Sequence, residues 1–126
     1  MTMFPRLAAI VVTAICLTAC GGSSPSNPTV TPDPAPANST TVTISSGASG
    51  QTTTAFGANP LTIATGTTIS WLNNDNTTHT SAADGNQWSS GNLAPGKRFN
   101  FTFASAGRFA YHCQIHPNMV GTIVVQ

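Results

Sequence analysis

Apolar and polar residues alternate along several short stretches that begin near residue 41. The alternation has the period of two that is typical of a strand with one buried face. Six such stretches predict strands at residues 41–45, 61–64, 67–72, 99–103, 109–113 and 120–125. In the later strands the residues that share a face are mostly aromatic, which assigns them to a core rather than to the surface.

The composition supports a fold made of strands. Thr, Ser, Gly, Asn and Pro are abundant while good helix formers are few, which favours short strands joined by turns. Two packed sheets can bury the alternating faces of such strands, so we predict an all-β sandwich with no helix longer than one turn. Trp71 and Trp88 are expected in its core.

Length and charge exclude several classes of function. A chain of 126 residues has room for one domain with a modest core, and too little for a two-domain enzyme. Four Lys and Arg residues stand against three acidic residues, giving a net charge of +1. Because there is no basic patch, binding of nucleic acid has little electrostatic basis.

Residues 1–19 have the features of an export signal. Arg6 precedes an apolar run that is shorter than the stretch of about 20 residues needed to span a bilayer. Residues 17–21 resemble the lipobox of bacterial lipoproteins, which implies that Cys20 becomes a lipidated N-terminus. The alternative is an ordinary cleaved signal with a coincidental Cys. Both readings predict export, and the first predicts a lipid-anchored protein of the periplasm or cell surface.

Residues 20–40 are predicted to be the lipidated Cys and a flexible, disordered linker. Their composition changes to Gly, Ser, Pro, Asn and Thr, with prolines too closely spaced for a helix or a central strand. Such a chain can hold a domain some tens of ångströms above a membrane, at about 3.1 Å per residue. The globular domain is expected to occupy residues 41–126.

The chemistry is concentrated in residues 111–119. Cys113, His116 and Met119 place a thiol, an imidazole and a thioether close together in the chain. This set of soft and borderline donors suits copper better than magnesium or calcium, and Met is a poor zinc ligand. The alternative is that Cys113 is a buried Cys without a metal-binding role. Pro117 disfavours helical geometry at His116 and so predicts an open loop that can wrap an ion.

A trigonal copper site with a long axial Met requires a second imidazole. The chain has three His. His112 precedes Cys113 in a strand, so its side chain points to the opposite face, away from the site. His79 follows a strand and a polar turn, and the remaining imidazole requirement selects it.

These residues resemble the cupredoxins. The similarity rests on residues 73–80, 111–119 and 120–125, and the spacing in the ligand loop is closest to the amicyanin branch of the plastocyanin-like proteins. It implies a Greek-key β-sandwich over residues 41–126 with one type 1 copper ion. The implied equatorial ligands are His79, Cys113 and His116, and the implied axial ligand is Met119.

Two positions depart from the family pattern beside the copper. Thr80 stands where members often have an Asn that ties the two ligand loops together, and Gln114 stands where a small hydroxyl residue is common. Groups at such positions tune the potential and hold the ligands in place. We expect a site that still binds copper.

A copper ion held by four protein ligands leaves no open position for substrate, so we expect an electron-transfer protein and not an enzyme. We expect a monomer. The resemblance implies that electrons enter and leave at the ring edge of His116 within an apolar patch, so a redox partner is expected to dock there. Candidate members of the patch are Leu93, Pro95, Pro117 and Asn118, with Phe56 or Pro60. The alternatives are a copper-storing or copper-delivering protein and an adhesion-like sandwich without metal.

Overall fold

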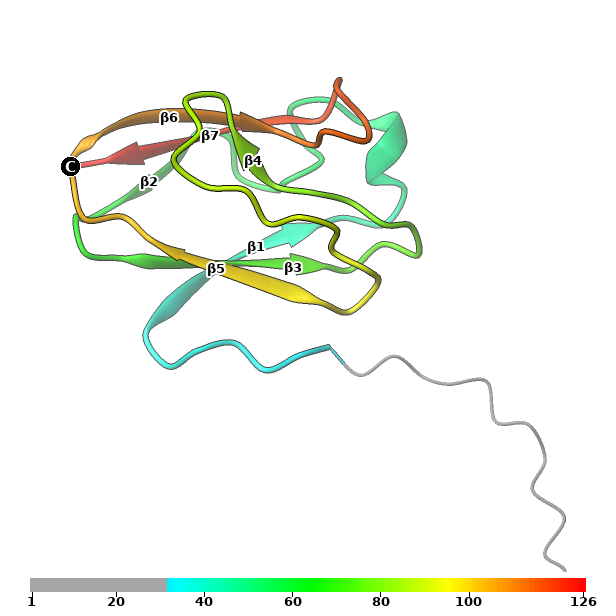
Figure 1. The fold of residues 1–126 in the computed structure, drawn as a ribbon, viewed down its shortest axis with the longest axis horizontal. Coiled ribbons are helices and arrows are strands. Elements are labelled where there is room, and N and C mark those ends of the chain that lie inside the picture. The colour runs from blue at the N-terminus through cyan, green and yellow to red at the C-terminus, as the bar shows by residue number, and fades with distance from the viewer. Residues whose placement is uncertain (1–31) are drawn as a thin grey trace, which may run out of the picture.

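Two β-sheets face each other in the computed structural model, which describes residues 32–126 (Figure 1). The first sheet contains, in spatial order, β1 (Ser39–Ile44), β3 (Thr68–Asn73) and β5 (Arg98–Thr102). The second contains, in spatial order, β2 (Leu61–Ile63), β7 (Val120–Val125), β6 (Gly107–His112) and β4 (Ala82–Ala83). The predicted all-β sandwich is confirmed.

Both sheets are mixed. β1 runs parallel to β3 and β2 runs parallel to β7, whereas the pairs β3–β5, β6–β7 and β4–β6 are antiparallel. All six predicted strands occur, with ends shifted by at most two residues. The two-residue strand β4 was not predicted. Within residues 32–126 the only helix is a single turn, η1 (Ala48–Gly50).

The aromatic residues pack between the sheets as the alternation predicts. Trp71 on β3 is fully buried and lies 5.4 Å from Trp88, 5.8 Å from Phe99 and 5.7 Å from Tyr111, measured between ring centroids. Aromatic pairs at such distances contribute about 0.5–1.5 kcal/mol each beyond the burial of their area. Trp88 comes from a loop but is buried, and its indole Nε1–H donates to Ser81 Oγ at 3.0 Å.

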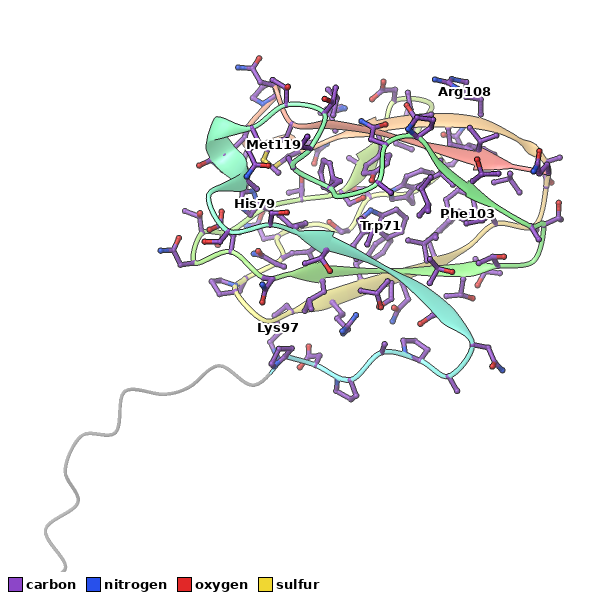
Figure 2. All side chains as sticks on the ribbon, turned by 180° about the vertical axis from the view of Figure 1, so that it is seen from behind. Trp71, His79, Lys97, Phe103, Arg108 and Met119 are labelled. Carbon is purple, nitrogen blue, oxygen red and sulfur yellow. The ribbon has the colours of Figure 1, made fainter. Side chains whose placement is uncertain are left out.

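One end of the sandwich collects the predicted metal ligands. β3 ends there at Asn73, β6 ends at His112 and β7 begins at Val120, so the loops after β3 and after β6 meet. Figure 2 shows His79 and Met119 together at this end, with Trp71 in the middle and Phe103 towards the other end. We call it the metal end.

The proposed export signal and Cys20 lie outside the described residues. Within the described part of the chain, no helix is long and apolar enough to cross a membrane. The expected start of the globular part, residue 41, falls inside β1, which begins at Ser39.

We predict that Gly121→Ala destabilises the sandwich. A Cβ at Gly121 on β7 would overlap the buried ring of Tyr111 on the neighbouring strand β6. Overpacking of this kind costs about 1–3 kcal/mol, which urea unfolding would detect as a lower midpoint. The matched control is Gly50→Ala, where an added Cβ meets nothing within 4 Å. Equal midpoints for the two variants would contradict the packing described here.

Candidate metal centre

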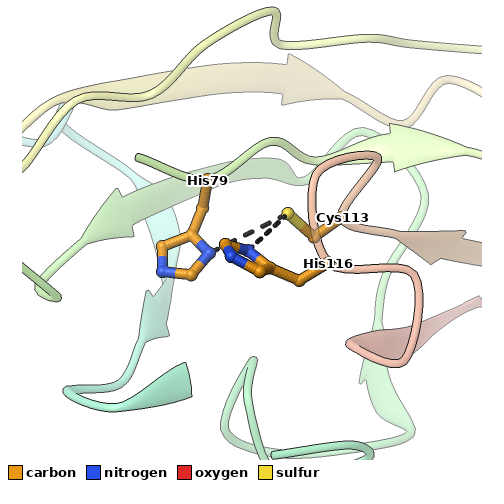
Figure 3. Close-up of side chains that lie close together, drawn as sticks. All are labelled: His79, Cys113 and His116. Atoms are coloured by element: carbon orange, nitrogen blue, oxygen red, sulfur yellow. Dashed lines mark hydrogen bonds between the residues drawn. The ribbon is translucent and has the colours of Figure 1, made fainter. Parts of the chain in front are cut away.

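Three nitrogen and sulfur donors converge at the metal end. The Sγ atom of Cys113 lies 3.8 Å from Nδ1 of His79 and 3.7 Å from Nδ1 of His116 (Figure 3). All three donor atoms lie within 4.8 Å of one another. His79 and Cys113 are fully buried, whereas His116 is half-buried. The structure therefore brings together three residues that the sequence predicted from different parts of the chain.

The spacing of these atoms fits a bound ion. Protein nitrogen and sulfur bind a divalent first-row metal at about 2.0–2.1 and about 2.3 Å respectively, as zinc sites show. With an angle of about 120° at the metal, those lengths separate the nitrogen from the sulfur by about 3.8 Å. The measured separations of 3.8 and 3.7 Å agree with that value. Two imidazoles and one thiolate are the donor set of a trigonal copper site.

A buried carboxylate orients the His79 ring. Nε2 of His79 lies 2.9 Å from Oδ2 of Asp75, and both side chains are buried. When Nε2 carries the proton and donates it to Asp75, Nδ1 keeps its lone pair on the side that faces Cys113. Hydrogen bonds of this kind fix the tautomer and ring orientation of metal-binding His. Asp75 is a functional residue that the sequence reasoning missed.

The Asp75 carboxylate accepts further hydrogen bonds from its own loop and from the loop after β1. Oδ1 accepts the backbone N–H groups of Gly47 at 3.1 Å and Asn76 at 2.8 Å, and Oδ2 accepts the hydroxyl of Thr77 at 3.0 Å. Burial alone would raise the pKa of Asp75. The hydrogen bonds outweigh it and hold that pKa well below its ordinary value of 3.8.

Asn73 holds the same loop from the inside. Its Nδ2 donates to the carbonyls of Thr77 at 2.7 Å and Leu93 at 2.8 Å, and its Oδ1 accepts the N–H of Asp75 at 2.9 Å. His79 and Leu93 also exchange two backbone hydrogen bonds, of 3.1 and 2.8 Å. His79 is therefore fixed through its backbone as well as through its ring.

Thr80 connects the two ligand loops. Its backbone N–H donates to Sγ of Cys113 at 3.3 Å, and its hydroxyl lies 3.8 Å from the same sulfur. The hydroxyl also accepts the backbone N–H of Gln114 at 2.7 Å. Thr80 thus makes the link for which the resemblance implies an Asn. Gln114 takes part through its backbone, and its side chain is exposed.

The ligand loop is closed by its own backbone. Cys113 N–H donates to the carbonyl of Met119 at 3.0 Å, and Met119 N–H donates to the carbonyl of His116 at 2.9 Å. Because the N–H of Cys113 turns to this loop, β6 ends one residue earlier than predicted. The Met119 side chain is fully buried at the metal end (Figure 2). Its bond to a metal stays a prediction.

The sequence matches the family described as Cupredoxin-like domain over residues 7–125. The chain belongs to this family. Cupredoxins are electron-transfer proteins and in general not enzymes. The centre of this cupredoxin, with His79, Cys113 and His116 together, fits a single type 1 copper.

Solved cupredoxins have a similar fold. A purple cupredoxin from Nitrosopumilus maritimus is 31% identical, with 68% of this chain and 98% of that chain covered and a TM-score of 0.63. A Cu(I) form of an amicyanin mutant is 22% identical, with 79% and 95% covered and a TM-score of 0.63. The likeness to amicyanin at this identity shows the shared fold.

The third His of this cupredoxin faces outward, as strand parity predicted. Nδ1 of His112 lies 2.7 Å from Oδ1 of Asp84, and both side chains reach solvent. His112 does not belong to the cluster of donor atoms.

The surface around His116 differs from the expected patch. Leu93 and Phe56 are 4% and 1% exposed, so neither can form part of a docking surface, and that expectation was wrong. The large apolar side chains that are exposed beside the ligand loop are Ile115, at 47%, and Val120, at 38%. We call Ile115, Pro117 and Val120 the apolar rim. Ile115 and Val120 flank the ligands along the chain, and this adjacency could have revealed them.

We predict that Asp75→Asn lowers the free energy of unfolding of the metal-free protein near neutral pH. An amide at this position loses the charge and turns an NH2 group towards N–H donors, which costs about 1.5–3 kcal/mol. Since the folded pKa of Asp75 lies below 3.8, its ionised form stabilises the fold above that pH, and the contribution is lost as pH falls further.

Urea midpoints at about pH 7 and about pH 3 would measure this effect. The difference between wild type and Asp75→Asn should shrink on acidification. Asp84→Asn is the matched control, because Asp84 is an exposed carboxylate that also pairs with a His. A difference of the same size at both pH values would argue against the role of Asp75.

Proposed function

We propose that this cupredoxin is an exported electron-transfer protein that shuttles one electron between redox partners through a single Cu(I)/Cu(II) ion and catalyses no reaction. The main support for this proposal is that the donor atoms of His79, Cys113 and His116 lie within 4.8 Å of one another. Two of these three residues are fully buried, which supports transfer of electrons rather than binding of a substrate.

The protein's contribution is to keep its donors in one arrangement. A bound copper supplies a one-electron couple. Asp75 holds the ring of His79, Thr80 holds the sulfur of Cys113, and the backbone closes the loop that carries His116. Donors fixed in this way need little rearrangement between oxidation states, which favours rapid transfer.

Met119 is proposed as the axial ligand. Its side chain is buried at the metal end, and its backbone bonds to those of Cys113 and His116. A thioether is a soft donor that suits Cu(I) as well as Cu(II).

Electrons would pass through the edge of His116. It is the one half-buried residue of the three, and Ile115 and Pro117 of the apolar rim are its neighbours in the chain. The net charge of +1 suggests that a partner docks mainly by apolar contact, with weak electrostatic steering. We propose a monomer that meets a redox protein at this rim.

Copper storage or delivery is the competing function. Burial of His79, Cys113 and Met119 opposes it, since handing over the ion would require the site to open. Fast electron self-exchange between Cu(I) and Cu(II) forms, with no copper passed to a chelating apoprotein, would support electron transfer. Copper handover without net redox change would support delivery.

We predict that the copper-loaded protein has an intense visible band from thiolate-to-copper charge transfer and that Cys113→Ser abolishes it. Met119→Gln is the matched variant in the same loop. It should keep the band and lower the potential, because a harder oxygen donor favours Cu(II). Absorption, EPR and voltammetry measure these outcomes. A full band in the Cys113→Ser protein would contradict the assignment of Cys113 as a copper ligand.

We also propose that a lipid on Cys20 anchors the protein to a membrane at the periplasm or cell surface. Several acyl chains on one residue give stable attachment. Cys20→Ser should then move the protein from the membrane fraction to the soluble fraction. The mass of the mature N-terminus is the direct measurement. Retention of the Cys20→Ser protein in membranes would speak against the anchor.

A further inference from the structure

The first strand starts at the end of the sandwich opposite the copper centre. Ser39 at the start of β1 pairs with Thr68, which pairs with Thr102 at the end of β5. At the other end of the same strand, Ile44 pairs with Asn73 at the metal end. A chain that continued straight back from Ser39 would leave the domain far from the copper centre.

Residues 32–38, which we call the strap, reverse this direction. Asn38 adopts φ +64°, in the left-handed region that Asn tolerates, and both N–H and Oγ of Ser39 donate to the carbonyl of Pro36. Beyond this turn, alternating prolines favour an extended chain of about 3.1 Å per residue. Residues 32–36 then span about 15 Å, most of the length of a six-residue strand. Figure 1 shows the strap running back beneath the first sheet.

The strap is fastened at its far end by Asp33. Its N–H donates to the carbonyl of Gly96 at 2.9 Å, and its own carbonyl accepts Nε–H of Arg98. Arg98 in turn donates to Ser70 Oγ at 3.1 Å, so the strap is bonded to the sheet. Lys97 adds an exposed ion pair with Asp33 at 3.2 Å, a type of contact that contributes little. The two hydrogen bonds of the Asp33 backbone, to the carbonyl of Gly96 and from Nε–H of Arg98, therefore carry the attachment.

The attachment point lies beside the copper centre. Gly96 N–H donates to the carbonyl of Asn73, the last residue of β3, at 2.8 Å. Pro32, Asp75 and Asn76 help to line a single hollow of about 280 Å³. Asp75 is the residue that holds His79. The strap thus returns the chain along the first sheet to the metal end and delivers it next to Asp75, the hydrogen-bond partner of His79.

We propose that the strap makes the tether, residues 21–31, leave at the metal end, so that this end faces the anchoring membrane and meets a redox partner held at that membrane. The proposal rests on the lipid anchor of the proposed function. Gly, Ser and Thr outnumber the two prolines in these eleven residues, and a Gly/Ser-rich coil of that length has a root-mean-square end-to-end distance of about 20 Å. A folded domain of this size is about 30 Å across. The point of exit therefore decides which end lies near the membrane.

Energy transfer to the membrane tests the orientation. A donor dye is placed on Ser46→Cys at the metal end or on Ser105→Cys between β5 and β6, both exposed positions. The full copper-loaded chain is held in phospholipid vesicles with an acceptor dye on the headgroups. Buried, copper-bound Cys113 escapes labelling. The ratio of transfer efficiencies, Ser46→Cys over Ser105→Cys, should exceed one.

Deleting residues 32–37 should bring the ratio to one or below, because the tether would then start at the far end. Deleting residues 23–28 is the matched control: it shortens the chain equally, leaves the strap intact and should keep the ratio above one. The visible copper band reports whether each variant is folded.

The labelled chain with an intact strap can already overturn the proposal. A ratio at or below one in membrane-bound protein with an intact strap overturns the role of the strap and leaves the anchor standing. Protein that is absent from the vesicles when Cys20 is intact overturns the anchor and the orientation with it.

Discussion

The candidate metal centre depends on the burial of one charge. Asp75 places a carboxylate inside the protein, and an ion in that position costs several kcal/mol unless its lone pairs are satisfied. Gly47, Asn76, Thr77 and His79 satisfy them, and they come from the loops after β1 and after β3. The geometry of both loops follows from this requirement, and the orientation of the His79 ring follows from the geometry.

The second requirement is that the two sheets stay in register with each other. His79 follows a strand of the first sheet and Cys113 follows a strand of the second, yet their donor atoms lie 3.8 Å apart. The packing of Trp71 against Tyr111 and Trp88 sets the separation of the sheets. Thr80 then adds a direct bond to the sulfur. A rigid core and a local hydrogen bond together fix the positions of the donor atoms.

The sequence predicted what depends on local pattern. Alternation located six strands because burial of one face repeats every two residues. The soft donors of residues 111–119 indicated copper because the preference of a site for a metal depends on the types of residue that supply the ligands. It missed the partner of His79, because nothing local distinguishes the buried carboxyl of Asp75 from the exposed one of Asp84. It misplaced Phe56 and Leu93 at the surface for the same reason, since their burial depends on loops that are distant in sequence. The export signal, the lipidation of Cys20 and the linker before residue 32 stay predictions.

Contacts on the two sides of the His79 ring explain how the metal end can both lie near the tether and contact a redox partner. Nε2 faces Asp75, whose surroundings include Pro32 at the start of the strap, whereas Nδ1 faces Cys113 and His116. The point where the chain leaves and the edge of His116 that reaches solvent therefore lie on different sides of one buried ligand. A tether fixed at this place can bring the centre close to a surface while the apolar rim of Ile115, Pro117 and Val120 stays open to a partner. The same arrangement would fail if the strap crossed the second sheet, because it would then compete with the partner for the rim.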